Sequence, residues 1–81
     1  MTGSAEVGER IRAARKHASL SQDELAERLH MGQATYSRIE RGLTDARGSA
    51  IATIADICGV SPDWLLLGRG DGPSLDAATA E

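Results

Sequence analysis

Cysteine, aromatic residues and long apolar runs are all scarce in this sequence of 81 residues, which has one Cys, one Trp, one Tyr and no Phe. The single cysteine, Cys58, cannot form an internal disulfide, and the Ile, Ala and Val residues around it indicate a small buried hydrophobe. No apolar run approaches the ~20 residues of a membrane span, and no basic and apolar signal begins the chain. We therefore expect no membrane contact and a reducing, cytoplasmic compartment.

The sequence is also too short for two stable cores, so we expect one domain. Ala, Leu and Ile carry its apolar content, which favours closely packed helices over a β-sandwich. No strand pattern or internal repeat is visible. We predict an all-α, compact five-helix bundle at residues 1–68, followed by a flexible tail or linker at 69–81 that is rich in Gly and small polar residues.

The net charge of −3 argues at first against a polyanionic partner, but the distribution of charge matters more than the sum. Residues 1–48 hold eight Lys and Arg against seven Asp and Glu, whereas residues 49–81 hold one Arg against five acids. Any polyanion should therefore dock on the first part of the chain. The acidic total predicts weak non-specific binding to nucleic acid, because that binding depends almost entirely on phosphate electrostatics.

Apolar spacing and capping residues predict five helices. The first begins with Ser4 as a possible cap and extends to about His17, and the second opens at the capping box Ser21-Gln22-Asp23-Glu24. The third runs over residues 33–41 and is stopped by Gly42.

Residues 43–47 are predicted to be a loop in which Asp45 is a possible cap for the fourth helix. That helix covers residues 50–58, with a weak start because Gly48 and Ser49 precede it. The fifth begins at Ser61-Pro62-Asp63, a cap followed by Pro at the first helical position, and is closed by Gly68.

Two helices joined by the three residues 30–32 form the geometric core of a DNA-binding helix-turn-helix, whose second helix lies in the major groove. At about 100° per residue, five side chains of the second helix fall within an arc of roughly 140°. These five residues are Gln33, Ala34, Ser37, Arg38 and Arg41, and none of them is acidic. Tyr36 and Ile39 point the other way, and Glu40 lies at the border.

The chemistry of this arc suits the edges of base pairs. A Gln amide can bond to adenine N6 and N7, and Arg can bond to guanine O6 and N7. The N–H groups at helix N-termini bind phosphate, and Gln22 and Gln33 both stand at such ends. Taken alone, the same side chains also fit an ordinary solvated helix face, and it is the capping box and the tight turn that favour DNA.

Residues 5–68 resemble the helix-turn-helix family of phage repressors and Cro proteins, which includes many small bacterial regulators (the XRE-like, lambda-repressor-like DNA-binding domain). Three segments carry the resemblance: Leu20-Ser21-Gln22-Asp23-Glu24-Leu25-Ala26, Ser37-Arg38-Ile39-Glu40-Arg41-Gly42 and Gly59-Val60-Ser61-Pro62-Asp63-Trp64-Leu65-Leu66. The resemblance implies a transcriptional regulator, most often a repressor, that binds a palindromic double-stranded DNA operator as a dimer. It implies no cofactor, metal or small-molecule ligand.

Roles for single residues follow from the resemblance by position. Base contacts are implied for Gln33, Ala34, Ser37 and Arg38, and contacts with the DNA backbone for Gln22, Gly32, Arg41, Thr44 and Arg47. Gln22 also matches a residue that braces the first recognition-helix Gln. Arg15 and Glu40 match a pair that bridges the first helix to the recognition helix, and losing one partner of such a pair costs more than the pair contributes.

The sequence departs from the family at three positions. His30 replaces a turn Gly whose backbone is usually left-handed, a conformation that His tolerates better than most residues. Gly32 replaces a Ser or Thr cap. Tyr36 replaces an aliphatic residue, and we predict that its ring fills the core with the hydroxyl reaching the surface, the alternative being a swing toward a phosphate.

The sequence offers less support for two other function classes. An enzyme is disfavoured because His17, His30 and Cys58 have no recognisable ligand spacing and no Gly-rich phosphate loop exists. A protein-interaction module that kept the fold but lost DNA binding is the stronger alternative, supported by the negative charge. A short helix cannot hide every apolar side of Trp64, Leu66 and Leu67, so we predict a homodimer contact there that sets two recognition helices ~34 Å apart.

Overall fold

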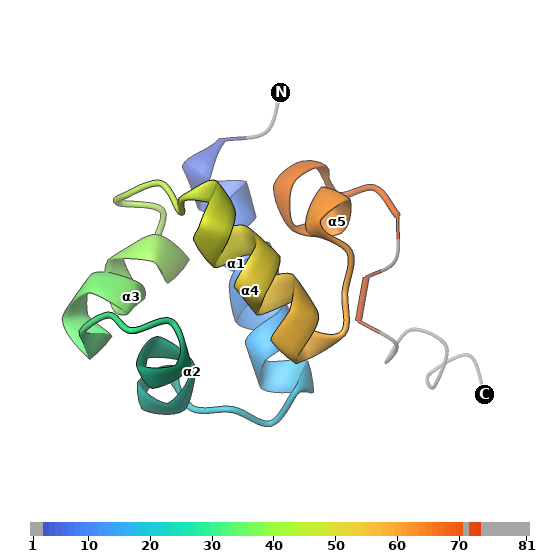
Figure 1. Cartoon of the computed structure of the whole chain (residues 1–81). Coiled ribbons are helices and arrows are strands. Elements are labelled where there is room, and N and C mark those ends of the chain that lie inside the picture. The colour runs from blue at the N-terminus through green and yellow to red at the C-terminus, as the bar shows by residue number, and fades with distance from the viewer. Residues whose placement is uncertain (1–2, 71, 74–81) are drawn as a thin grey trace.

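The computed structural model describes residues 3–70 and 72–73, and these form five α-helices and no strand (Figure 1). The helices are α1 (Ser4–His17), α2 (Gln22–Arg28), α3 (Gln33–Glu40), α4 (Gly48–Cys58) and α5 (Pro62–Leu67). The predicted all-α class and five-helix architecture are confirmed. Over the described part of the chain, no helix is long and apolar enough to cross a membrane.

α1 and α4 occupy the middle of the domain, with α2 and α3 on one side and α5 on the other (Figure 1). α1 contacts α3, α4 and α5, whereas α2 packs on α3. One continuous core joins all five helices, because burying one apolar stripe of each helix is what stabilises the bundle. Its fully buried large side chains are Ile11, Leu25, Tyr36, Ile51, Ile54 and Leu65.

Local signals set most helix ends. The Ser21 hydroxyl accepts from the Glu24 N–H at 3.0 Å while the Glu24 carboxylate accepts from the Ser21 N–H at 2.8 Å, which confirms the predicted capping box. The bond from the Ser21 N–H, helped by the nearby Ser21 hydroxyl, holds the pKa of Glu24 below its usual value. Ser61 caps α5 through the Trp64 N–H, with Pro62 at the first position. His30 has φ 60°, so its predicted left-handed conformation is present.

Two capping predictions were wrong. The cap of α1 is Gly3, whose N–H donates to the Glu6 carboxylate at 2.6 Å, so that an acid three residues further on takes the place of a capping hydroxyl. Ser4 is already helical, and its hydroxyl donates to Asp45 in the loop before α4. Asp45 therefore ties that loop to α1 instead of capping α4, whose cap is Arg47 without a side-chain bond.

The close approach of α1 to the end of α3 depends on Gly8. A Cβ at this position would lie 2.5 Å from the carbonyl oxygens of both Ile39 and Glu40, closer than real atoms come. The backbones of α1 and α3 can therefore approach this closely only because α1 has a glycine, with no Cβ, at position 8. This contact fixes the place of α3 on the domain.

Part of the predicted tail lies against α5. A Cβ on Gly70 would lie 2.9 Å from the Ser61 hydroxyl, and one on Gly72 would lie 2.6 Å from Trp64 Nε1. Pro73 is buried. These short distances mean that the segment follows the N-terminal half of α5. Residues 71 and 74–81, on which the rest of the predicted tail falls, lie outside the described residues.

Candidate nucleic-acid interface

α2 and α3 pack on each other and are separated by the short turn that His30 makes possible. The Met31 N–H donates to the Ala26 carbonyl at 3.0 Å, which closes the end of α2. Gly32 then caps α3 in an extended conformation, without a side-chain bond. The helix-turn-helix geometry expected from the sequence is therefore present.

The outward face of α3 carries the predicted arc of side chains. Gln33, Ala34, Arg38 and Arg41 are exposed, and Ser37 is half-buried, whereas Tyr36 and Ile39 are in the core. No acidic side chain shares this face, since Glu40 is only 6 % exposed. The face offers amide and guanidinium groups to solvent, which is the chemistry that major-groove base edges accept.

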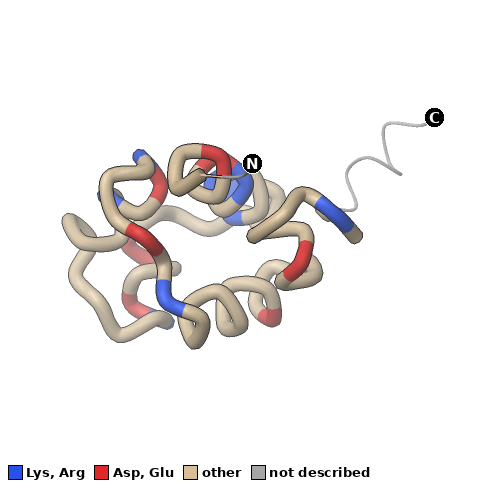
Figure 2. Tube along the Cα trace, turned by 90° about the horizontal axis from the view of Figure 1, so that it is seen from above, with Lys and Arg blue, Asp and Glu red and all other residues tan. Residues whose placement is uncertain are grey.

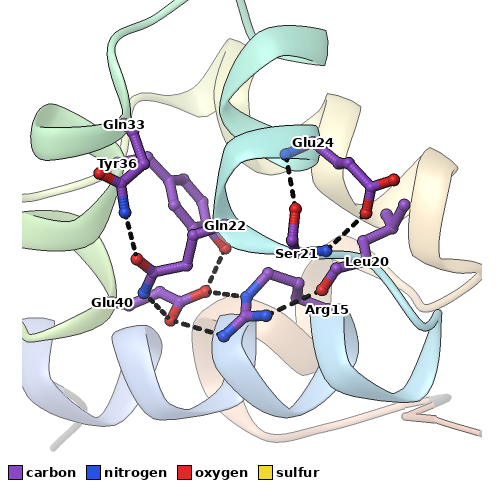
Figure 3. A network of polar contacts seen from close by, with 8 residues as sticks. All are labelled: Arg15, Leu20, Ser21, Gln22, Glu24, Gln33, Tyr36 and Glu40. Atoms are coloured by element: carbon purple, nitrogen blue, oxygen red, sulfur yellow. Dashed lines mark hydrogen bonds and ion pairs between the residues drawn. The ribbon is translucent and has the colours of Figure 1, made fainter.

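Gln33 does not project freely from this face. Its Nε2 donates to Gln22 Oε1 at 2.8 Å, which is the brace implied by the family resemblance (Figure 3). Gln22 in turn donates from Nε2 to Glu40 Oε1 at 3.0 Å. The side chain at the start of α3 is thus tied through α2 to the end of α3.

Glu40 also holds the predicted bridge to α1. Arg15 Nε donates to Glu40 Oε2 at 2.6 Å and Arg15 Nη2 to Oε1 at 3.3 Å, while Arg15 Nη1 reaches the Leu20 carbonyl at 2.8 Å (Figure 3). The two side chains are 10 % and 2 % exposed, so the pair is buried. Burial disfavours the charged carboxylate, but hydrogen bonds from Arg15, Tyr36 and Gln22 outweigh it and hold the pKa of Glu40 below its usual value.

Tyr36 corrects one prediction. Its ring fills the core as expected and is completely buried, but its hydroxyl turns inward and donates to Glu40 Oε2 instead of reaching the surface. The residues stand four apart on one helix, so the i, i+4 spacing was the signal that this contact could have been predicted from. Burial, together with the bond to Glu40, raises the pKa of Tyr36 strongly, so the hydroxyl stays a donor.

The residues predicted to contact the DNA backbone are spread over the turns. Gly32 and Arg41 flank α3 and are exposed, and Arg47 is exposed at the start of α4. Thr44 is exposed in the loop between α3 and α4, but it lines an open groove of about 1000 Å³ together with Leu66 and Leu67. Thr44 therefore lies near the exposed leucines of α5 as well as near the end of α3, whose Ile39 lines the same groove.

The predicted dimer residues differ in how far they are available. Leu66 and Leu67 are 39 % and 54 % exposed on α5. Trp64 is half-buried, and the backbone of Gly72 covers part of its indole. Only the two leucines are thus well exposed to a partner.

Arg10 was missed by the sequence reasoning. Its Nε donates to the Leu65 carbonyl at 3.0 Å and its Nη2 to the Leu66 carbonyl at 3.1 Å, so it satisfies the open end of α5 from α1. No local signal could reveal a contact between residues 55 and 56 positions apart. The contact fixes the helix that carries the exposed leucines.

Charged residues are mixed along α1, whereas α4 carries a single one, Asp56 (Figure 2). Within the described residues, no group of three or more His, Cys, Asp and Glu side chains could hold a metal ion. Cys58 is buried, as predicted, and burial raises the pKa of its thiol.

Comparisons with known proteins agree with this geometry. A model of the family described as "HTH_3: Helix-turn-helix" matches residues 11–65. The chain is 34% identical over 65 residues to the HTH-type transcriptional regulator DicA of Escherichia coli (strain K12) and 33% identical over 60 residues to the HTH-type transcriptional regulator ImmR of Bacillus subtilis (strain 168). These matches cover 80% and 74% of the chain but 48% and 47% of the relatives, so the chain spans about half their length.

Two solved structures are similar in fold. The P22 c2 repressor, crystallised in complex with a synthetic operator, superposes with a TM-score of 0.71 at 33% identity, covering 78% of this chain and 96% of that one. A hypothetical transcription factor, NHTF from Neisseria, gives a TM-score of 0.71 at 25% identity over 99% of this chain and 86% of the other.

Proposed function

Because the chain belongs to the HTH_3 helix-turn-helix family, whose members are DNA-binding transcriptional regulators and not enzymes, we propose that it recognises one DNA operator and represses transcription there. The observation that carries the proposal is the acid-free face of α3 with Gln33 already braced by Gln22 at 2.8 Å. A regulator of this kind acts where the chromosome is, in the cytoplasm.

On this proposal α3 enters the major groove. Gln33, Ala34, Ser37 and Arg38 contact base edges, because these positions share the outward face of the helix. The backbone contacts come from the flanking positions, Gln22, Gly32, Arg41, Thr44 and Arg47. The P22 c2 repressor, which has the same fold, binds an operator, and this similarity supports the geometry.

The proposal includes a homodimer on a palindromic site. Leu66 and Leu67 offer exposed apolar surface beside the groove at α5, and Arg10 holds this helix in place. Pairing two copies there places the recognition helices about one DNA turn, ~34 Å, apart. Sedimentation of Leu67→Glu against the control Leu43→Glu, which changes a leucine that is 62% exposed in the loop after α3, tests this contact. Equal self-association of both variants would remove α5 from the interface.

Selection of bound sequences from a random duplex pool tests the function itself. We expect a palindrome whose half-sites lie about 10 base pairs apart and whose affinity falls steeply as salt rises. Failure to bind any duplex at low salt would overturn the proposal and favour the alternative, a protein-interaction module with the same fold, which the net charge of −3 and the exposed leucines favour.

A further inference from the structure

A continuous chain of hydrogen bonds runs from the core to the recognition face (Figure 3). Arg15 and Tyr36 both donate to Glu40 Oε2, Gln22 Nε2 donates to Glu40 Oε1 at 3.0 Å, and Gln33 Nε2 donates to Gln22 Oε1 at 2.8 Å. Its inner members are buried, with Tyr36 at 0% and Glu40 at 6% exposure, while Gln33 is exposed. The network thus connects groups that cannot touch DNA with one that faces it.

The chemistry of the inner end fixes the direction of every bond in this chain. An ionised carboxylate only accepts hydrogen bonds and a guanidinium only donates them. Gln22 must therefore turn its NH₂ group toward Glu40, which leaves its carbonyl facing Gln33. Gln33 must in turn give an N–H to that carbonyl. The Gln33 carbonyl and second N–H are then free, in one fixed order.

We infer that Glu40, gripped by Arg15 and Tyr36, is a specificity-determining residue that sets the amide orientation of Gln33 from inside the core. The inference rests on the proposed function for its consequence at DNA. Adenine presents an acceptor, N7, beside a donor, the N6 amino group, so a Gln amide pairs with it in one order only. A Gln33 free to flip would also present the reversed order, which sets its NH₂ against the adenine amino group.

Tyr36 is the positioning residue that supplies the last hydrogen bond to the Glu40 carboxylate. Arg15 Nε alone would leave Glu40 Oε2 with one partner, and the Tyr36 hydroxyl supplies the second. Two donors on Oε2 keep the carboxylate from rotating, so Oε1 stays aimed at Gln22. The tyrosine ring is wholly buried, so its hydroxyl can influence DNA binding only through the hydrogen bonds that link Glu40, Gln22 and Gln33.

The variant Tyr36→Phe removes this donor and keeps the ring in the core. Two measurements are made: the side-chain amide NMR resonances of Gln22 and Gln33 in the free protein, and the ratio of affinities for a pool-selected site with adenine and with another base at the Gln33 position. We expect both amide groups to shift and exchange faster with solvent. We also expect the adenine preference to fall about 2- to 10-fold, which is the worth of one hydrogen bond.

Ile54→Val is the matched control, because it removes one buried methylene from α4 and removes no hydrogen bond of the network. It should leave the resonances and the base preference unchanged. A second test adds Tyr36→Phe to Gln22→Leu, which already breaks the chain nearer to DNA. In that background Tyr36→Phe should have no further effect on base preference, and an additive loss would overturn the inference.

The outcomes separate this inference from the proposed function. If Tyr36→Phe loses affinity equally for all sequences, Tyr36 is a packing residue only and the inference fails. Unchanged amide resonances would also overturn the inference. Shifted resonances with an unchanged base preference would overturn it as well. If the wild-type chain binds no duplex, the proposed function fails. The resonances of the free protein then still decide whether Tyr36 and Glu40 fix the Gln33 amide.

Discussion

Replacing Arg15 with methionine removes the cation of the buried pair while keeping most of the volume of the side chain. Glu40, whose side chain is 2 % exposed, then keeps its charge with only Tyr36 and Gln22 as partners, and the Leu20 carbonyl loses its guanidinium donor. Breaking one side of a buried ion pair costs about 3–5 kcal/mol, because the remaining charge stays out of water without its counter-ion.

This cost is large for the domain. A chain of 81 residues is typically stable by about 4–12 kcal/mol. At about 4–8 °C for each kcal/mol, Arg15→Met should lower the melting temperature by about 12–40 °C. Thermal and urea unfolding followed by circular dichroism measure the effect. An unchanged slope of the free energy of unfolding against urea concentration would show that the unfolded state exposes the same surface in both proteins.

Arg12→Met is the control, since it removes an exposed arginine from the same helix and should change stability by less than about 0.5 kcal/mol. The double variant Arg15→Met/Glu40→Met should lose less than the sum of the two single variants, because it leaves no unpaired charge. A loss below about 1 kcal/mol for Arg15→Met, or strict additivity in the double variant, would refute the reasoning.

Three further predictions concern the recognition helix and its support. Arg38→Ala and Gln33→Ala should each cost about 1–3 kcal/mol on the selected site and relax preference at one base pair; an equal loss on every sequence, measured by titration, would make the residue a phosphate contact. Gly8→Ala should destabilise the fold by about 1–3 kcal/mol, because α1 and α3 must separate, whereas Gly48→Ala, with nothing within 4 Å, should not; equal melting temperatures would contradict the close approach. The pKa of Glu40 is lower in the folded protein, so the unfolded chain binds more protons at acid pH. The contribution of Glu40 to the free energy of unfolding should therefore be fully present above pH ~4.3 and fall as the pH drops below this value. Urea titrations at several pH values measure it, and a free energy of unfolding that does not change below pH ~4.3 would contradict the buried carboxylate.

The helix positions and the caps of α2 and α5 could be predicted from the sequence because they depend on neighbours in the chain. The capping box at Ser21 and Glu24, the Pro62 start of α5 and the left-handed His30 all follow from residues within one turn. The outward face of α3 followed from helical period alone. The bridge between Arg15 and Glu40 spans 25 residues and was implied only by the family resemblance.

The tertiary structure decided what depends on distant backbone. The bond from Gln22 to Glu40 and the Arg10 contact with α5 each require two helices at a fixed distance. The Tyr36 hydroxyl bonds within α3, at a spacing of four residues that the sequence already offered. Ser4 and Asp45 were assigned to separate caps until the fold brought them together across 41 positions. Local propensity cannot carry such information, because it arises only when packing fixes the helices against one another. The sequence by itself thus determined which side chains α3 presents, whereas the packed core decided how the side chain of Gln33 is held.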